Sequence, residues 1–187
     1  MEEILKEIYQ VSPYLRFKNL TDFEEGEVGF PIYGEITMKG VDLLVKKFIT
    51  HFNDETVFFD LGSGLGKMVA HIGLKYKVKK SVGIEYSKER YNGSLHIKEK
   101  FFPTENNIIF INDNFMDADI SDATVIYLDN TALPNNLIEK LYDEIPVGCL
   151  LLYKKSLRFI PLKLQNKGID VVERTYNQNE LYWIIKQ

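Results

Sequence analysis

The segment Val57–Val69, which reads VFFDLGSGLGKMV, constrains the fold more than any other part of the chain. Its apolar run ends in an acid, Asp60, glycines then occupy alternate positions, and a helical apolar periodicity begins near Lys67. A short buried strand, a glycine turn and a helix in this order are typical of an open parallel sheet. Because ligands of such sheets bind beyond the carboxyl ends of the strands, the segment also predicts where a ligand site lies.

Strand and helix patterns alternate along the rest of the chain. Strand patterns recur at 81–85, 107–113, 123–130 and 149–156, and helical patterns at 41–52, 67–76, 87–101 and 135–145. Two later β-patterned runs, 168–177 and 180–187, predict a hairpin. We therefore expect an α/β fold with a doubly wound, mostly parallel seven-stranded sheet and a C-terminal antiparallel hairpin. Residues 1–39 are expected to form a helical and irregular N-terminal arm, and 40–187 the main domain, within one compact unit.

The composition is typical of a folded protein without a general attraction to polyanions. Of 187 residues, 45% are hydrophobic and 27% are charged, which favours a globular domain over disorder. The 23 basic and 27 acidic residues give a net charge of -4, and no apolar run approaches the roughly 20 residues of a membrane span. We expect neither a sequence-specific nucleic-acid partner nor a membrane partner, and no residue is assigned to a metal.

The single cysteine and the N-terminus indicate the compartment. Cys149 lies in the apolar run GCLLLY, where a thiol packs as a small hydrophobic side chain. A lone cysteine forms no intramolecular disulfide, and the first ten residues, MEEILKEIYQ, carry acids where a signal or transit peptide has bases. The expectation is an intracellular protein of a reducing compartment, nucleus or cytoplasm.

The spacing of the glycines separates three classes of ligand. A P-loop needs four residues between its first glycine and a Gly-Lys pair, whereas three separate Gly62 from Gly66, and Met68 stands where the P-loop has Ser or Thr. A dinucleotide-binding turn has its third glycine five positions after the first, whereas Gly66 follows Gly62 by four. The remaining pattern, acid-x-Gly-x-Gly-x-Gly, resembles motif I of the class I methyltransferases that use S-adenosylmethionine. The alternative is a glycine-rich packing turn beside an exposed acid.

The motif I resemblance implies a Rossmann-like class I methyltransferase fold, with S-adenosylmethionine as cofactor and S-adenosylhomocysteine as product. In that family the acid, here Asp60, attracts the methionyl ammonium, and the glycines let the backbone approach the ligand. Glu85, 25 residues after Asp60 at the end of the second strand, is placed to accept hydrogen bonds from the ribose hydroxyls.

Several stretches between Tyr33 and Leu157 resemble one branch of these enzymes: the lysine methyltransferases without a SET domain, named for disruption of telomeric silencing, which act on a core histone. YGEIT (33–37) is similar to the branch's cofactor-covering loop, VGIE to its ribose strand, INDNF to its adenine loop, and ATVIYLDNTAL and VGCLLLYKKSL to its fourth and fifth strands. The cofactor-binding residues that the resemblance implies are Tyr33, Glu35, Thr37, Asp60, Gly62, Ser63, Gly64, Gly66, Lys67, Glu85, Asp113, Asn114, Phe115 (packed on adenine) and Asp129.

Some of these positions depart from the branch or have a second interpretation. Lys67 stands where the branch commonly has Gln, and either pairs with the cofactor carboxylate or is an exposed helix lysine. Asp113 and Asn114 both offer an acceptor for the adenine amine, and the choice stays open. Asp129 and Asn130 replace a pair of asparagines; a carboxylate there holds the target ammonium, or the pair caps the next helix.

Tyr182 and Trp183 align with the aromatic wall of the branch's lysine channel, although core aromatics of a β-strand have the same pattern. Such a channel favours, by desolvation, the neutral amine that attacks the methyl group. With Asp129 and Asn130, these two aromatics are the candidate catalytic residues.

The sequence therefore favours a protein-lysine N-methyltransferase acting on a core histone, free or in a nucleosome. The basic segments Lys75–Lys80 and Tyr153–Arg158 are candidates for nucleosome contact, or are solvated element ends. The alternatives are lysine methylation of a non-histone protein, as in a branch that acts on organelle proteins, and a catalytically silent fold that binds a partner through 12–39. A nucleic-acid methyltransferase acting on exocyclic amines is disfavoured, because LDNTAL lacks the Asn/Asp-Pro-Pro-aromatic motif.

Overall fold

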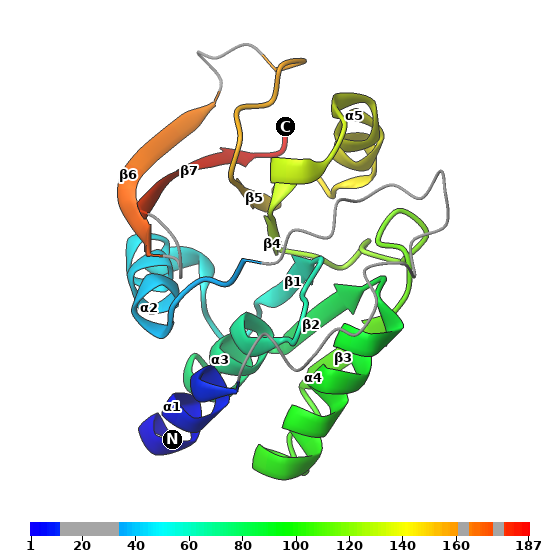
Figure 1. The fold of residues 1–187 in the computed structure, drawn as a ribbon. Helices are drawn as coiled ribbons and strands as arrows, with labels where there is room; N and C mark the ends of the chain where they lie inside the picture. Colours follow the sequence, from blue (N-terminus) through cyan, green and yellow to red (C-terminus); the bar gives the residue numbers. More distant parts are fainter. Residues whose placement is uncertain (12–33, 161–164, 174–177) are drawn as a thin grey trace.

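One β-sheet runs through the part of the chain that the computed structural model describes, residues 1–11, 34–160, 165–173 and 178–187. Its strands are β1 (Val57–Leu61), β2 (Lys80–Glu85), β3 (Ile108–Asn112), β4 (Val125–Leu128), β5 (Leu150–Tyr153), β6 (Asn166–Glu173) and β7 (Gln178–Ile185). These seven described strands have the order β3-β2-β1-β4-β5-β7-β6, with β1 to β5 parallel and β7 antiparallel to both of its neighbours (Figure 1). The expected doubly wound, mostly parallel sheet with an antiparallel C-terminal hairpin is confirmed.

The strand order reverses next to β1, which determines where a ligand can enter. β1 pairs in parallel with β2 on one side and with β4 on the other. Because parallel strands end at the same edge of a sheet, the turns that follow Leu61, Glu85 and Leu128 lie together at this edge. We call it the carboxyl edge; it carries the predicted ligand site.

Helices cover the two faces of the sheet unequally (Figure 1). α1 (Glu2–Gln10), α2 (Met38–Lys47), α3 (Lys67–Lys75) and α4 (Lys88–Phe101) contribute to a core cluster on one face. α5 (Asn135–Glu144) packs in a second cluster on the opposite face, beside the connection from β3 to β4. That connection, 113–124, contains no helix, so irregular backbone covers part of the second face.

The helical pattern at 41–52 forms two elements rather than the one that was expected. α2 ends at Lys47, and a 3-10 turn, Ile49–His51, follows. Two consecutive β-branched residues in that turn disfavour continuation of the α-helix. Phe48 and Phe52 are nevertheless buried in the core, as the pattern predicted.

The strands alternate between the two core clusters, as their period of two requires. Phe58 belongs to the cluster under α1 to α4, whereas Phe59 belongs to the cluster under α5.

Cys149 is 1% exposed, and burial raises the pKa of its thiol to about 12, so the prediction of a core cysteine is confirmed. None of the helices in the described residues is long and apolar enough to span a membrane.

Candidate functional site

The glycine turn leaves β1 and folds back against the end of β2. The backbone N–H groups of Gly62 and Ser63 donate to the carbonyl oxygen of Ile84, at 2.8 and 3.0 Å. Gly62 and Gly64 have φ angles of 88° and 57°, in the region that favours glycine. A Cβ added at Gly62 meets nothing within 4 Å, so the backbone there is open to a ligand.

The third glycine of the motif serves packing as well as conformation. Gly66 has a φ angle of 70°, and a Cβ there would lie 2.2 Å from the ring of Phe110. Ser63 has a similar close contact, because a Cβ added at Gly83 of β2 would lie 2.6 Å from its Oγ. The Ser63 side chain therefore lies against the backbone of β2, and Gly83 is a residue whose importance the sequence analysis missed.

Glu85 is buried at the end of β2 and ties the turn to the start of α4. Its Oε2 accepts a 2.7 Å hydrogen bond from Gly64 N, and its Oε1 accepts a 2.8 Å hydrogen bond from Ser87 N. A carboxylate has about four lone-pair sites, so each oxygen keeps acceptor capacity for one hydroxyl group. The carboxylate is thus held in place by two backbone donors while facing the carboxyl edge.

Asn112, at the end of β3, orients the same region and was not predicted. Its Nδ2 donates to the carbonyl oxygens of Glu85 and Tyr86, at 2.8 and 3.0 Å. A polar residue at the end of an apolar strand was the available sequence signal.

Asp60 is also buried, and its register partner Gly83 puts it on the same face of the sheet as Glu85, two residues further along β2.

Lys67 is neither an exposed helix lysine nor a side chain extended toward an open ligand site. It is 4% exposed, so the surface interpretation was wrong. Its Nζ donates to Glu35 Oε2 at 2.8 Å, to Val11 O at 2.6 Å and to Tyr9 O at 3.5 Å. Because an ammonium has three N–H donors, these contacts use all of them, and pairing with a cofactor carboxylate requires that one of them break.

The remaining residues of the predicted covering loop lie just before α2. Thr37 is the N-cap of α2, and its Oγ1 accepts a 3.1 Å hydrogen bond from Gly40 N. Glu35 is largely buried, with an 11% exposed side chain paired with Lys67. Tyr33 lies outside the described residues, so its predicted contact with the cofactor stays a prediction.

The predicted adenine loop is a local turn whose polar side chains bond to its own backbone. Asp113 Oδ1 accepts from Asn114 N at 2.8 Å, and Asn114 Oδ1 accepts from Met116 N at 3.1 Å. Neither contact singles out one residue for the adenine amine, so the choice between them stays open. Phe115 is partly buried and packs against the core cluster under α5.

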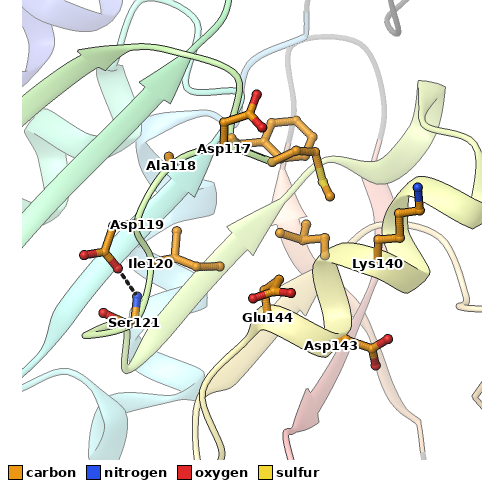
Figure 2. Close-up of a pocket in the computed structure, with 11 residues that line it drawn as sticks. Asp117, Ala118, Asp119, Ile120, Ser121, Lys140, Asp143 and Glu144 are labelled. Atoms are coloured by element: carbon orange, nitrogen blue, oxygen red, sulfur yellow. Dashed lines mark hydrogen bonds between the residues drawn. The ribbon is translucent and has the colours of Figure 1, made fainter.

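Phe115 also lines a cavity of about 500 Å³ between the β3–β4 connection and α5. Figure 2 shows Ile120 projecting between these two segments, with Asp119 on the connection accepting from Ser121 N. The cavity lies over the second face of the sheet, whereas Asp60 and Glu85 belong to the strand positions of the first face. It is therefore separate from the glycine turn.

Asp129 and Asn130, the predicted catalytic pair, have different surroundings. Asp129 Oδ1 accepts from Thr131 N at 3.1 Å and from Thr131 Oγ1 at 2.5 Å, which caps the 3-10 turn Asn130–Ala132. Asn130 is 2% exposed, and its Oδ1 accepts from the N–H groups of Lys154 and Lys155. Its Nδ2 donates to Lys155 O at 2.7 Å. Asn130 thus joins the ends of β4 and β5 through these backbone contacts, and its predicted contact with the substrate stays a prediction.

Tyr182 and Trp183 lie on opposite faces of the sheet and do not form one wall of a channel. Tyr182 stacks on Tyr153, with ring centroids 5.7 Å apart, in the cluster under α5. Trp183 packs edge-to-face on Phe48 in the other cluster, with the Nζ of Lys47 3.8 Å from its ring centroid. Of the two, Tyr182 lies nearer the carboxyl edge, because its register partner Tyr153 is the last residue of β5.

Comparison with known proteins agrees with this geometry. The model of the family described as "Histone methylation protein DOT1" matches residues 9–183. The chain belongs to this family. A structure of an RNA methyltransferase from Salinibacter ruber superposes with a TM-score of 0.57 at 22% identity, covering 78% of this chain and 88% of that one. This likeness shows the fold, so the expected Rossmann-like methyltransferase architecture of the DOT1 family chain is confirmed.

Two curated relatives match the chain, one over about half of it and the other over nearly all of it. A protein-lysine N-methyltransferase of Saccharolobus islandicus is 32% identical over 101 residues, which cover 54% of this chain and 62% of the relative. A histone-lysine N-methyltransferase of Emericella nidulans, specific for lysine 79 of histone H3, is 26% identical over an alignment of 216 residues, covering 98% of this chain and 40% of the relative. The chain therefore spans less than two thirds of the length of either relative.

Proposed function

We propose that the chain is a protein-lysine N-methyltransferase that uses S-adenosylmethionine and acts on a core histone. The observation that carries the proposal is that Asp60, the glycine turn and Glu85 lie together at the carboxyl edge of a DOT1 family chain. Support comes from the two relatives, which are named as lysine methyltransferases, and from the Salinibacter enzyme, which was solved with S-adenosyl-L-homocysteine. A core-histone substrate associates the protein with chromatin.

The residues at the carboxyl edge fit the polar groups of this cofactor. Glu85 keeps one acceptor site on each oxygen, which matches two ribose hydroxyls. Asp60 supplies a buried carboxylate on the same face for the methionyl ammonium. The open backbone at Gly62 lets the ligand approach the turn without meeting a side chain.

Methyl transfer from a sulfonium to an amine is an in-line displacement, so the protein has to align the amine and exclude water. The cofactor supplies the methyl group. The target lysine must first lose a proton, because the ordinary pKa of its ammonium is about 10.4. Asp129 and Tyr182 are the residues that we assign to the amine, since they lie next to the ends of β4 and β5.

The two basic segments differ in their position relative to the carboxyl edge. Lys75 forms ion pairs with Asp42 and Glu2, and Lys80 begins β2 at the opposite edge of the sheet. Tyr153–Arg158 begins with the last residue of β5, at the carboxyl edge, and is held there by the contacts of Asn130 with Lys155. This favours Tyr153–Arg158 as the segment that faces the substrate protein.

The test incubates the protein with radiolabelled S-adenosylmethionine and, in parallel, with nucleosomes, free core histones and a cell extract. Gly64→Arg is the inactive control, because a side chain at a φ of 57° strains the turn beside Glu85. Label on a histone lysine is the expected result. Label only on an extract protein keeps the chemistry and refutes the histone substrate, and binding of S-adenosylhomocysteine without any transfer indicates a catalytically silent fold.

A further inference from the structure

Lys67 joins two segments that are far apart in the chain. It is the first residue of α3, directly after the glycine turn. Of its three acceptors, the Tyr9 and Val11 carbonyl oxygens lie at the end of α1, and Glu35 Oε2 lies in the described loop 34–37, which precedes α2. One buried ammonium therefore connects α1, the loop and the turn.

The Lys67–Glu35 pair is buried on both sides. The Lys67 side chain is 4% exposed and that of Glu35 is 11% exposed, with 2.8 Å between Nζ and Oε2. Loss of the Lys67 ammonium removes a charge-assisted hydrogen bond from the Glu35 carboxylate, and breaking one side of a buried ion pair is costly. Replacement of Lys67 by an uncharged residue therefore removes the contact that joins the loop to the end of α1 and the start of α3.

The end of α1 is itself fixed to the core. Leu5 and Ile8 of this helix are fully buried. Tyr9 Oη lies 3.2 Å from His71 Nδ1, and His71 Nε2 lies 3.0 Å from Asp42 Oδ1, which ties α1 to α3 and α2. Because α1 is held in this way, its carbonyl oxygens form a firm anchor for Lys67.

We infer that Lys67 is a positioning residue that clasps loop 34–37 to the end of α1, so that cofactor affinity depends on the docking of the N-terminal helix. This role rests on the proposed function, since it assigns the loop to the cofactor. It replaces direct pairing between Lys67 and the cofactor carboxylate. The consequence is that α1, which lies outside the motif I unit, forms part of the cofactor-binding machinery.

The test compares Lys67→Met with Lys67→Arg, which keeps the charge, and with Lys98→Met. Lys98, which lies on α4 away from the loop, is a matched control because its Nζ also donates to a backbone carbonyl, that of Ile108 in β3. Two quantities are measured in the full chain well below its melting temperature: hydrogen exchange of the amides of 34–37, and the Kd of S-adenosylhomocysteine by calorimetry.

We expect Lys67→Met to speed exchange at 34–37 and to raise the Kd at least about tenfold, within the usual range of coupling between sites. At saturating cofactor, kcat should stay within about twofold of wild type, because the clasp acts on binding rather than on the transfer step. Lys67→Arg should retain most of the affinity. Lys98→Met should change the melting temperature only.

Unchanged exchange at 34–37 in Lys67→Met overturns the clasp, as does a Kd that rises equally in Lys98→Met. A Kd that rises while exchange stays at the wild-type rate points instead to direct pairing with the cofactor. If the wild-type chain binds no S-adenosylhomocysteine while exchange still responds to Lys67→Met, the proposed function fails and the link between loop and α1 remains.

Discussion

Replacement of Asn130 by Ala separates a structural clamp from a catalytic contact. The Asn130 side chain is 2% exposed and makes three hydrogen bonds to the backbone of Lys154 and Lys155, 2.7 to 3.0 Å long. Each such bond contributes about 1 kcal/mol, so the loss of all three costs roughly 3 kcal/mol. For a domain of this size that loss lowers the melting temperature by roughly 6–12 °C.

The assay is thermal unfolding of wild type, Asn130→Ala and Asn92→Ala, followed by turnover per folded molecule at a temperature where all three are folded. Asn92 is the control because it is exposed on α4. The clamp also orders the basic segment after β5, so we expect the KM for the substrate protein to rise in Asn130→Ala. A change in melting temperature below about 2 °C with turnover abolished would refute the clamp and restore a direct contact with the substrate.

Other substitutions test the cap, the turn and the buried histidine. Asp129→Asn keeps an acceptor for the cap but removes the negative charge. We expect turnover to fall about tenfold or more at an unchanged melting temperature. Unchanged turnover would show that Asp129 only caps the 3-10 turn. In urea unfolding, Gly66→Ala should lower the free energy of unfolding by about 3 kcal/mol, because the new Cβ would lie 2.2 Å from Phe110. Gly62→Ala, with open space around it, should lower it by about 1 kcal/mol. Equal costs would contradict the packing role of Gly66. Burial lowers the pKa of His71 from 6.5 to about 4. Between pH 6.5 and about 4, the His71 imidazole therefore takes up a proton in the unfolded chain but not in the folded one. The free energy of unfolding should therefore fall on acidification from pH 7 to 4 by on the order of 3 kcal/mol, and a His71→Gln variant with the same pH slope would contradict this.

The parts of the site that lie close together in sequence could be predicted from it. The strand, glycine turn and helix of Val57–Val69 form a local unit, and the structure has β1 and α3 at those positions. Glu85 could be predicted because strand length and the spacing after Asp60 determine which residue ends β2. The helical pattern predicted at 87–101 begins with Ser87, which is the N-cap of α4 and whose Oγ accepts from Arg90 N.

The clamps could not be predicted, because their partners are distant in sequence and follow no periodicity. Lys67 contacts Val11 across 56 residues, and Asn130 contacts Lys155 across 25. A polar residue after a strand or at a helix start has the same local signal whether it faces a ligand or a backbone carbonyl. Only the fold brings the α1 end and the β5 end to these side chains.

The assignment of Tyr182 and Trp183 to one channel conflicts with the period of a β-strand, and the sequence alone held this information. The two residues are adjacent in a run that was predicted to be a strand, and adjacent strand residues face opposite sides of the sheet. The pairings of Tyr182 with Tyr153 and of Trp183 with Leu152 place them over different core clusters. An aromatic wall built on β7 can therefore use Tyr182 or Trp183 but not both, and we propose Tyr182 because its partner Tyr153 lies at the carboxyl edge.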